Sequence, residues 1–157
     1  MSTAVITGAG SGIGRAIALE LANHGHQAVI MEIDEAAGEE TADAIREAGG
    51  TARVVGCDIS QTESAQAAFA QIEAIDILVN NAGIVRSGAI SDLDEDDWDQ
   101  MFAVNAKGLF LMSRAALPAL QKSKGAIVNI SSVAGLQGHA GMSAYCGSKF
   151  AAIGITQ

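Results

Sequence analysis

Short apolar runs alternate with stretches of helical spacing along the whole chain. All of these runs except the first are rich in valine and isoleucine, and most lack the polar alternation of a strand with one face in water. Such runs are typical of parallel strands that are covered on both faces of a sheet. We therefore expect strands over residues 3–6, 28–31, 52–56, 75–80 and 126–130.

Between these runs the apolar residues recur at helical spacing. Ile13, Ile17 and Leu21 repeat every four residues directly after the first strand. Similar patterns predict helices over residues 35–48, 65–72 and 98–120. Alternation of strand and helix implies right-handed crossovers and predicts an α/β fold, a three-layer sandwich around a parallel sheet, in a single domain over residues 1–157.

Two polar patterns mark helix starts. Ser60, followed three residues later by Glu63, is a capping-box signature ahead of the helix over 65–72. Acidic side chains cluster over residues 92–99, where they would face the partial positive charge of a helix N-terminus. We interpret this acidic run as a solvated helix entry and not as a ligand site, because charge runs are usually surface features.

Composition and charge exclude several classes of protein. The chain has 157 residues, 49% of them hydrophobic, and 18 acidic against 9 basic side chains, for a net charge of −9. This composition is too apolar for a disordered chain, and the acidic balance argues against nucleic acid as a partner. No apolar run approaches the ~18 residues of a membrane span, and no basic leader opens the chain, so we expect neither a membrane partner nor a signal peptide.

The cysteines and histidines argue against disulfide and metal chemistry. Cys57 and Cys146 lack C-x-x-C spacing, and we expect them to be small buried thiols in a reducing, cytoplasmic environment. The three histidines show no metal-binding spacing, so we expect no metal site.

A glycine-rich loop follows the first strand and opens the first helix. Its spacing, Gly8-x-x-x-Gly12-x-Gly14, differs from the strict G-x-G-x-x-G order, and no Lys-Ser/Thr follows as in a P-loop. Glycines at such a turn let the backbone approach a pyrophosphate, and the helix behind it points free N–H groups at the anion. The candidate dinucleotide-binding residues of this loop are Gly8, Ser11, Gly12, Ile13 and Gly14.

Glu32 ends the second strand, within the ~20 residues expected between such a loop and a ribose-binding acid. Its carboxylate can accept hydrogen bonds from both hydroxyls of the adenosine ribose, and it would repel a 2′-phosphate. The loop holds no Arg or Lys that could neutralise that phosphate. Both features favour NAD over NADP as the cofactor. Taken alone, Glu32 is equally well interpreted as an ordinary charge at a strand end.

Four further segments follow the later strands in order. They are Asp58-Ile59 after the third strand, Asn80-Asn81-Ala82-Gly83 after the fourth, Ile130-Ser131-Ser132 after the fifth, and finally Tyr145-Cys146-Gly147-Ser148-Lys149. Together with the glycine loop, they resemble the short-chain dehydrogenase/reductase family in both identity and order. A Tyr-x-x-x-Lys pair alone has little specificity, whereas five ordered elements across essentially the entire chain are a strong signal.

The resemblance implies a Rossmann-like, doubly wound sheet whose first five strands have the order 3-2-1-4-5. It also implies that Asp58 and Ile59 flank the adenine ring of a bound dinucleotide. Asn80, Ala82 and Gly83 would line the cofactor cleft and brace the central sheet.

The same resemblance assigns the reacting groups. Asn105 matches the helix position whose distorted backbone holds a water in the family's proton relay, although its side chain could instead bond to its own helical turn. Ser132 matches the serine that contacts substrate, and the adjacent Ser131 is interpreted as a structural hydroxyl. Tyr145 is the acid–base group, and Lys149 would also bind the hydroxyls of the nicotinamide ribose.

The residue types themselves suit this chemistry. A free phenol titrates near pKa ~10, which is too high for a base at neutral pH. On a helix Lys149 shares a face with Tyr145, and its ammonium favours the phenolate, as does the positive charge of an oxidised nicotinamide. Tyr145 can then remove the alcohol proton as hydride leaves the carbon, while Ser132 donates a hydrogen bond to the oxygen.

The sequence thus predicts an NAD-dependent oxidoreductase that interconverts a secondary alcohol and a ketone, and the resemblance implies a homo-oligomer, either a dimer or a tetramer. The alternative is a module that binds the dinucleotide but does not catalyse. A flavodoxin-like domain, with strand order 2-1-3-4-5, shares the alternation of elements. It leaves Tyr145, Lys149 and the segment 80–83 unexplained.

The chain departs from the family pattern at its end. It stops at Gln157, inside the helix expected to carry Tyr145, before the family's sixth strand, substrate lid and seventh strand. We therefore expect a truncated form of a longer dehydrogenase. In such a form the strand over 126–130 is an uncovered sheet edge, and the nicotinamide half of the cleft lacks a wall.

Overall fold

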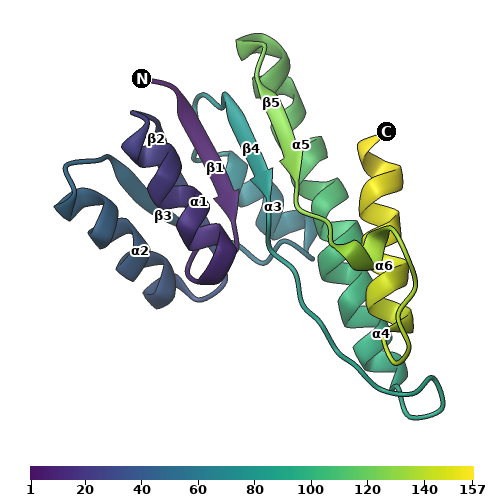
Figure 1. Ribbon diagram of the computed structural model, residues 1–157. Coiled ribbons are helices and arrows are strands. Elements are labelled where there is room, and N and C mark those ends of the chain that lie inside the picture. Colours follow the sequence, from purple (N-terminus) through teal and green to yellow (C-terminus); the bar gives the residue numbers. More distant parts are fainter.

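A five-stranded parallel sheet forms the centre of the protein. The computed structural model describes all residues from 1 to 157, and the strands have the order β3-β2-β1-β4-β5 (Figure 1). Their bounds are β1 Thr3–Thr7, β2 Gln27–Glu32, β3 Ala52–Gly56, β4 Ile77–Asn80 and β5 Ala126–Asn129. The predicted order is confirmed, and the flavodoxin-like order is excluded because β1 pairs with both β2 and β4.

Helices cover both faces of this sheet. One face carries α1 (Gly12–Asn23) and α2 (Glu35–Glu47), and the other carries α3 (Thr62–Phe69) and α5 (Leu109–Ser123) (Figure 1). Beyond the β5 end of the sheet, α4 (Glu95–Phe102) packs against α6 (Ser143–Thr156). A π-helical segment, Ala103–Gly108, joins α4 to α5, and a 3₁₀ turn, Val133–Gly135, precedes α6. None of these helices combines the length and the apolar character needed to cross a bilayer.

Side chains of the inner strands alternate between two buried apolar clusters. Val5 of β1 pairs with Val29 and Leu78, and all three are inaccessible to solvent in the cluster shared with α3 and α5. Their neighbours Ala4 and Ile6 point into the opposite cluster, which is shared with α1 and α2. Burial on both faces explains why these strands show no polar alternation.

The last strand, β5, departs from this pattern. It lies at the edge of the sheet, and its residues alternate between exposed and half-buried, with Val128 46% exposed. Ile127 packs against one of the buried clusters. The expectation of an uncovered sheet edge is therefore confirmed, and the expectation of burial on both faces is wrong for this strand.

Two expected helices have different bounds in the structure. The long helix expected before β5 is interrupted by the π-helical segment, whose single wider turn hardly changes the apolar periodicity. The helix expected over 65–72 begins at Thr62 with Gln61 as its N-cap, so the capping-box prediction is wrong. The Ser60 hydroxyl instead donates to the carboxylate of Asp58 (2.7 Å).

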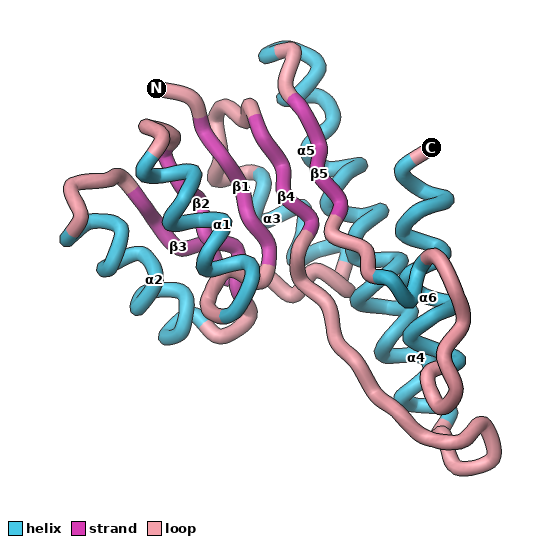
Figure 2. The backbone as a smooth tube through the Cα atoms, in the orientation of Figure 1, coloured by secondary structure: helices cyan, strands magenta, loops and turns pink.

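A long connection links β4 to α4 and passes beside the loop that precedes α6 (Figure 2). The Gly88 N–H donates to the Gly141 carbonyl oxygen (2.9 Å) and so joins the two loops. Arg86 of the same connection forms an ion pair with Asp97 of α4 (3.5 Å). The acidic run opens α4, where its carboxylates fill the first helical turn, as the sequence predicts.

Candidate active site

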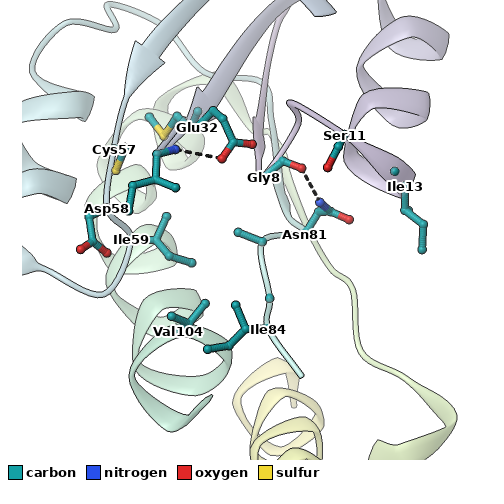
Figure 3. A pocket seen from close by; sticks show the side chains of 15 residues that line it. Gly8, Ser11, Ile13, Glu32, Cys57, Asp58, Ile59, Asn81, Ile84 and Val104 are labelled. Atoms are coloured by element: carbon teal, nitrogen blue, oxygen red, sulfur yellow. Dashed lines mark hydrogen bonds between the residues drawn. The ribbon is translucent and has the colours of Figure 1, made fainter. Parts of the chain in front are cut away.

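A cavity of about 470 Å³ lies where β1, β2, β3 and β4 end (Figure 3). Open parallel sheets bind ligands outside the carboxyl ends of their strands, at the point where the strand order reverses. In this sheet that point lies between β1 and β4, and the volume is in the range of small-molecule sites. The predicted residues that line the cavity are Gly8, Ser11, Gly12, Ile13, Glu32, Asp58, Ile59, Ala82 and Gly83.

The cavity wall also contains residues that the sequence analysis did not assign to the site, namely Met31, Ile33, Cys57, Asn81, Ile84 and Val104. Asn81 could have been found from its place inside the segment 80–83. The apolar residues carry no signal of their own, because in sequence they are indistinguishable from core positions. Burial raises the pKa of the Cys57 thiol, so a neutral thiol lines this part of the wall.

The floor of the cavity depends on a close approach between the glycine loop and the end of β4. Gly8 has a φ of +63°, and a β-carbon there would lie 2.8 Å from the Cα atom of Ala82. A β-carbon on Gly14 would overlap the carbonyl oxygen of Gly8 and the side-chain amide of Asn81. That amide donates to the carbonyl oxygens of Thr7 (3.0 Å) and Gly8 (3.1 Å) and ties the loop to β4. Gly14 therefore lies beneath the loop and not on the cavity wall.

The N-terminus of α1 opens toward the cavity without a side-chain cap. Ser11 is the N-cap residue, and its hydroxyl makes no capping hydrogen bond. The first N–H groups of a helix have no partner within the helix. Those of Gly12 and Ile13 belong to residues on the cavity wall and are suited to bind an anion.

Glu32 occupies the rim between the glycine loop and β2. One carboxylate oxygen, Oε2, accepts the Gly10 N–H (2.9 Å), and Oε1 accepts the Ile33 N–H (2.9 Å). Glu32 and Asp58 are the charged side chains of the cavity wall, and no Lys or Arg lines it. This side of the cavity is therefore anionic.

Asn80 lies outside the cavity wall, in contrast to the role expected of it as a lining residue. It is buried at the end of β4, and its Nδ2 donates to the hydroxyl of Ser113 (2.9 Å) and to Oδ1 of Asn129 (2.8 Å). These contacts brace β4 against α5 and β5. The structure thus shows the bracing contacts but no contact with the cavity.

Asn105 lies in the π-helical segment and holds the main chain of Ile84. Its Oδ1 accepts the Ile84 N–H (2.8 Å), and its Nδ2 donates to the Ile84 carbonyl oxygen (2.8 Å) and to the hydroxyl of Ser148 (3.0 Å). The side chain therefore does not bond to its own helical turn, and that interpretation is wrong. The distorted helical backbone implied by the family resemblance is present.

The other predicted reacting groups lie in or near α6, outside the cavity wall. Lys149 is buried, with its Nζ 5.9 Å from the ring centroid of Tyr145. Its Nζ donates to the carbonyl oxygen of Ile130 (3.0 Å), and burial lowers the pKa of this ammonium. Ser132 precedes the 3₁₀ turn, where its Oγ accepts the Ala134 N–H (3.1 Å).

The predicted residues of the cavity wall and the predicted reacting groups in or near α6 adjoin at Gly83. A β-carbon there would lie 3.2 Å from Oδ1 of Asn105 and 3.4 Å from Nζ of Lys149. The Ser131 hydroxyl donates to the carbonyl oxygen of Lys149 (3.0 Å), which is the structural role expected of it. No cluster of three or more His, Cys, Asp or Glu side chains is arranged to hold a metal ion.

Comparison with known proteins agrees with this geometry. A family model described as short chain dehydrogenase matches residues 2–157. The chain belongs to the short-chain dehydrogenase family. The resemblance inferred from the glycine loop and the four later segments is thereby confirmed.

Members of this family resemble the chain over almost its whole length. It is 40% identical over 158 residues to the 3β-hydroxysteroid dehydrogenase of Mediterraneibacter gnavus, covering 98% of this chain and 57% of that protein. A Burkholderia phymatum short-chain dehydrogenase/reductase in complex with NAD aligns with a TM-score of 0.92 at 37% identity, covering 99% of this chain and 57% of that one. A Beutenbergia cavernae structure with NADP at low occupancy aligns with a TM-score of 0.93 at 36% identity, with 99% and 64% covered. The chain thus spans less than two thirds of the length of these relatives.

Replacing Gly14 by alanine should destabilise the fold, because the new β-carbon has no space beside Gly8 and Asn81. We expect the free energy of unfolding to fall by about 1–3 kcal/mol, as for other overpacked sites. Urea denaturation measures this change. The matched control is Gly154→Ala in α6, where a β-carbon meets nothing within 4 Å and helix propensity favours alanine. Equal losses in the two variants would contradict the close approach.

Proposed function

We propose that the chain binds a nicotinamide dinucleotide across the carboxyl edge of its sheet, with the pyrophosphate over the N-terminus of α1. The uncapped N–H groups of Gly12 and Ile13 carry this proposal, since they lie on the wall of the cavity and suit an anion. The positive φ of Gly8 and its contact with Ala82 keep side chains out of the path of the phosphates. The structure of the Burkholderia relative is a complex with NAD, which supports a nicotinamide dinucleotide as the ligand.

The charges of the cavity wall favour NAD over NADP. Glu32 already accepts three backbone N–H groups at the rim, those of Gly10, Ile33 and Asp34, and can accept the ribose hydroxyls in the same way. A 2′-phosphate at this position would face the carboxylates of Glu32 and Asp58 with no Lys or Arg on the wall to balance it. Two like unit charges about 4 Å apart repel by about 4 kcal/mol at an effective dielectric constant of about 20.

The reaction that suits these groups is the interconversion of a secondary alcohol and a ketone. A bound nicotinamide supplies the hydride acceptor or donor. Tyr145 takes the proton from the alcohol oxygen, or returns it to the carbonyl oxygen in the reverse direction. The Lys149 ammonium, 5.9 Å from the Tyr145 ring centroid, favours the phenolate. Ser132 donates a hydrogen bond to the substrate oxygen.

The second candidate function is dinucleotide binding without turnover. It is favoured by the composition of the cavity wall, which holds none of Tyr145, Lys149 and Ser132. Binding and turnover must therefore be measured separately.

Replacing Glu32 by glutamine should weaken NAD binding and reduce the preference over NADP. The substitution keeps the shape of the side chain and removes the charge, so hydrogen bonds from the ribose hydroxyls lose their charge assistance. We expect the Kd for NAD to rise about tenfold, equivalent to ~1.4 kcal/mol, and the Kd for NADP to fall relative to it. Isothermal titration calorimetry measures both. Glu35→Gln, in the first turn of α2 and off the cavity wall, serves as the control, and unchanged ratios in Glu32→Gln would refute the role of this carboxylate.

Replacing Tyr145 by phenylalanine should leave NAD affinity within about twofold of the wild type and abolish turnover. Phenylalanine keeps the ring and removes the hydroxyl, so general acid–base assistance of typically 10²–10⁴-fold is lost. Calorimetry measures the affinity, and NADH absorbance across a panel of secondary alcohols measures the turnover. A variant that retains most of its activity would overturn the role of Tyr145. Wild-type binding without any turnover would favour the second candidate function.

A further inference from the structure

Ser148 lies at a junction between the two halves of the site. Its side chain is completely buried in α6. The hydroxyl accepts a hydrogen bond from Nδ2 of Asn105 (3.0 Å) and donates one to the carbonyl oxygen of Tyr145 (2.8 Å). Asn105 in turn holds both peptide groups of Ile84, which lines the cavity. A continuous chain of hydrogen bonds therefore runs from the cavity wall to the main chain of Tyr145.

This chain of hydrogen bonds uses the full donor capacity of Asn105. An asparagine amide has two N–H donors and one carbonyl acceptor. One N–H points to the Ile84 carbonyl oxygen and the other to Ser148, while the amide oxygen accepts the Ile84 N–H. A flipped amide would set its N–H groups against the Ile84 N–H, so the orientation is fixed. Without the Ser148 hydroxyl, one N–H would remain unpaired in buried surroundings.

The residue before Ser148 makes a second contact with the same helical region. Gly147 lies against the ring of Phe102, and a β-carbon there would be 3.1 Å from the ring. Phe102 also stacks on Trp98, with ring centroids 4.8 Å apart. This apolar packing brings α6 close to α4 but is not directional. The hydrogen bond between Asn105 and Ser148 is directional, and it is the side-chain hydrogen bond that links the π-helical segment to α6.

The geometry points to Ser148 as a positioning residue that sets the helix of Tyr145 and Lys149 against the loop that contacts the dinucleotide. This inference rests on the function proposed above. Hydride transfer requires reacting atoms about 3–3.5 Å apart, and a misplacement of about 1 Å can cost ~100-fold in rate. Ser148 touches neither substrate nor cofactor in this role. It acts through the position of α6.

The test compares Ser148→Ala with a matched control, Ser123→Ala. Ser123 is also a helical serine whose hydroxyl lies within hydrogen-bond distance of the carbonyl oxygen three residues earlier, that of Leu120 (3.2 Å), and of the carbonyl oxygen of Ile75 (2.7 Å), in the connection before β4. It lies at the end of α5, away from the cavity. We expect Ser148→Ala to lower kcat by about tenfold to 100-fold, with NAD affinity within about twofold, and Ser123→Ala to change neither. An unchanged kcat per folded molecule in Ser148→Ala overturns the inference.

A second readout requires no turnover. Tyr145 is the only tyrosine in the chain, so ultraviolet absorbance follows its ionisation alone. NAD⁺ brings a positive nicotinamide near the phenol and should lower the pKa of Tyr145 in the wild type and in Ser123→Ala. In Ser148→Ala, saturated with NAD⁺, we expect a smaller lowering because the phenol is no longer held against the nicotinamide.

The outcomes separate this inference from the proposed function. A wild-type chain that binds no dinucleotide overturns the proposed function and, with it, the positioning role. If NAD⁺ binds the wild-type chain but lowers the Tyr145 pKa equally in the wild type, Ser123→Ala and Ser148→Ala, the positioning role alone is overturned. Where binding occurs without turnover, the comparison of Tyr145 ionisation decides.

Discussion

The close approach of the glycine loop to the end of β4 is the constraint on which the rest of the site depends. The chain must leave β1 and enter α1 within a few residues while passing directly over Ala82 and Asn81. Gly8 and Gly14 allow this passage because neither has a β-carbon. The side-chain amide of Asn81 then donates hydrogen bonds to two carbonyl oxygens, those of Thr7 and Gly8. As a result the N-terminus of α1 is open toward the cavity, where its N–H groups face the position proposed for the pyrophosphate.

The proposed reacting groups on α6 are positioned by contacts with the segment that follows β4. Ile84 follows the β4 segment directly, and Asn105 fixes its main chain to the π-helical segment. Through Ser148, the same amide reaches the helix that carries Tyr145 and Lys149. A buried polar network of this kind is rigid when every member is paired and costly when one is missing. The relative position of the cavity and the proposed reacting groups thus depends on a few directional bonds.

Features set by short-range chemistry could be predicted from the sequence. Spacing from a strand end is a local property, and it correctly predicts Glu32 and every candidate loop residue except Gly14 on the cavity wall. The strand order followed from the family resemblance, since periodicity alone also fits a flavodoxin-like order. Features that depend on tertiary partners were missed. The π-helical turn leaves the apolar period almost intact, and the Ser60 hydroxyl bonds to Asp58 and does not cap α3. The role of Ser148 could not be predicted from the sequence either, because a serine in a helix carries no sign of which residues pack against it.

The most direct test of dinucleotide binding at this site is a measurement at the glycine loop itself. Amide resonances of Gly12 and Ile13 can be followed by nuclear magnetic resonance as NADH is added to the folded chain. If the pyrophosphate binds there, both resonances shift with the same saturation curve, together with that of Ile33 beside Glu32. Unmoved resonances at Gly12 and Ile13, in a chain whose spectrum remains that of a folded protein, would contradict this placement of the pyrophosphate.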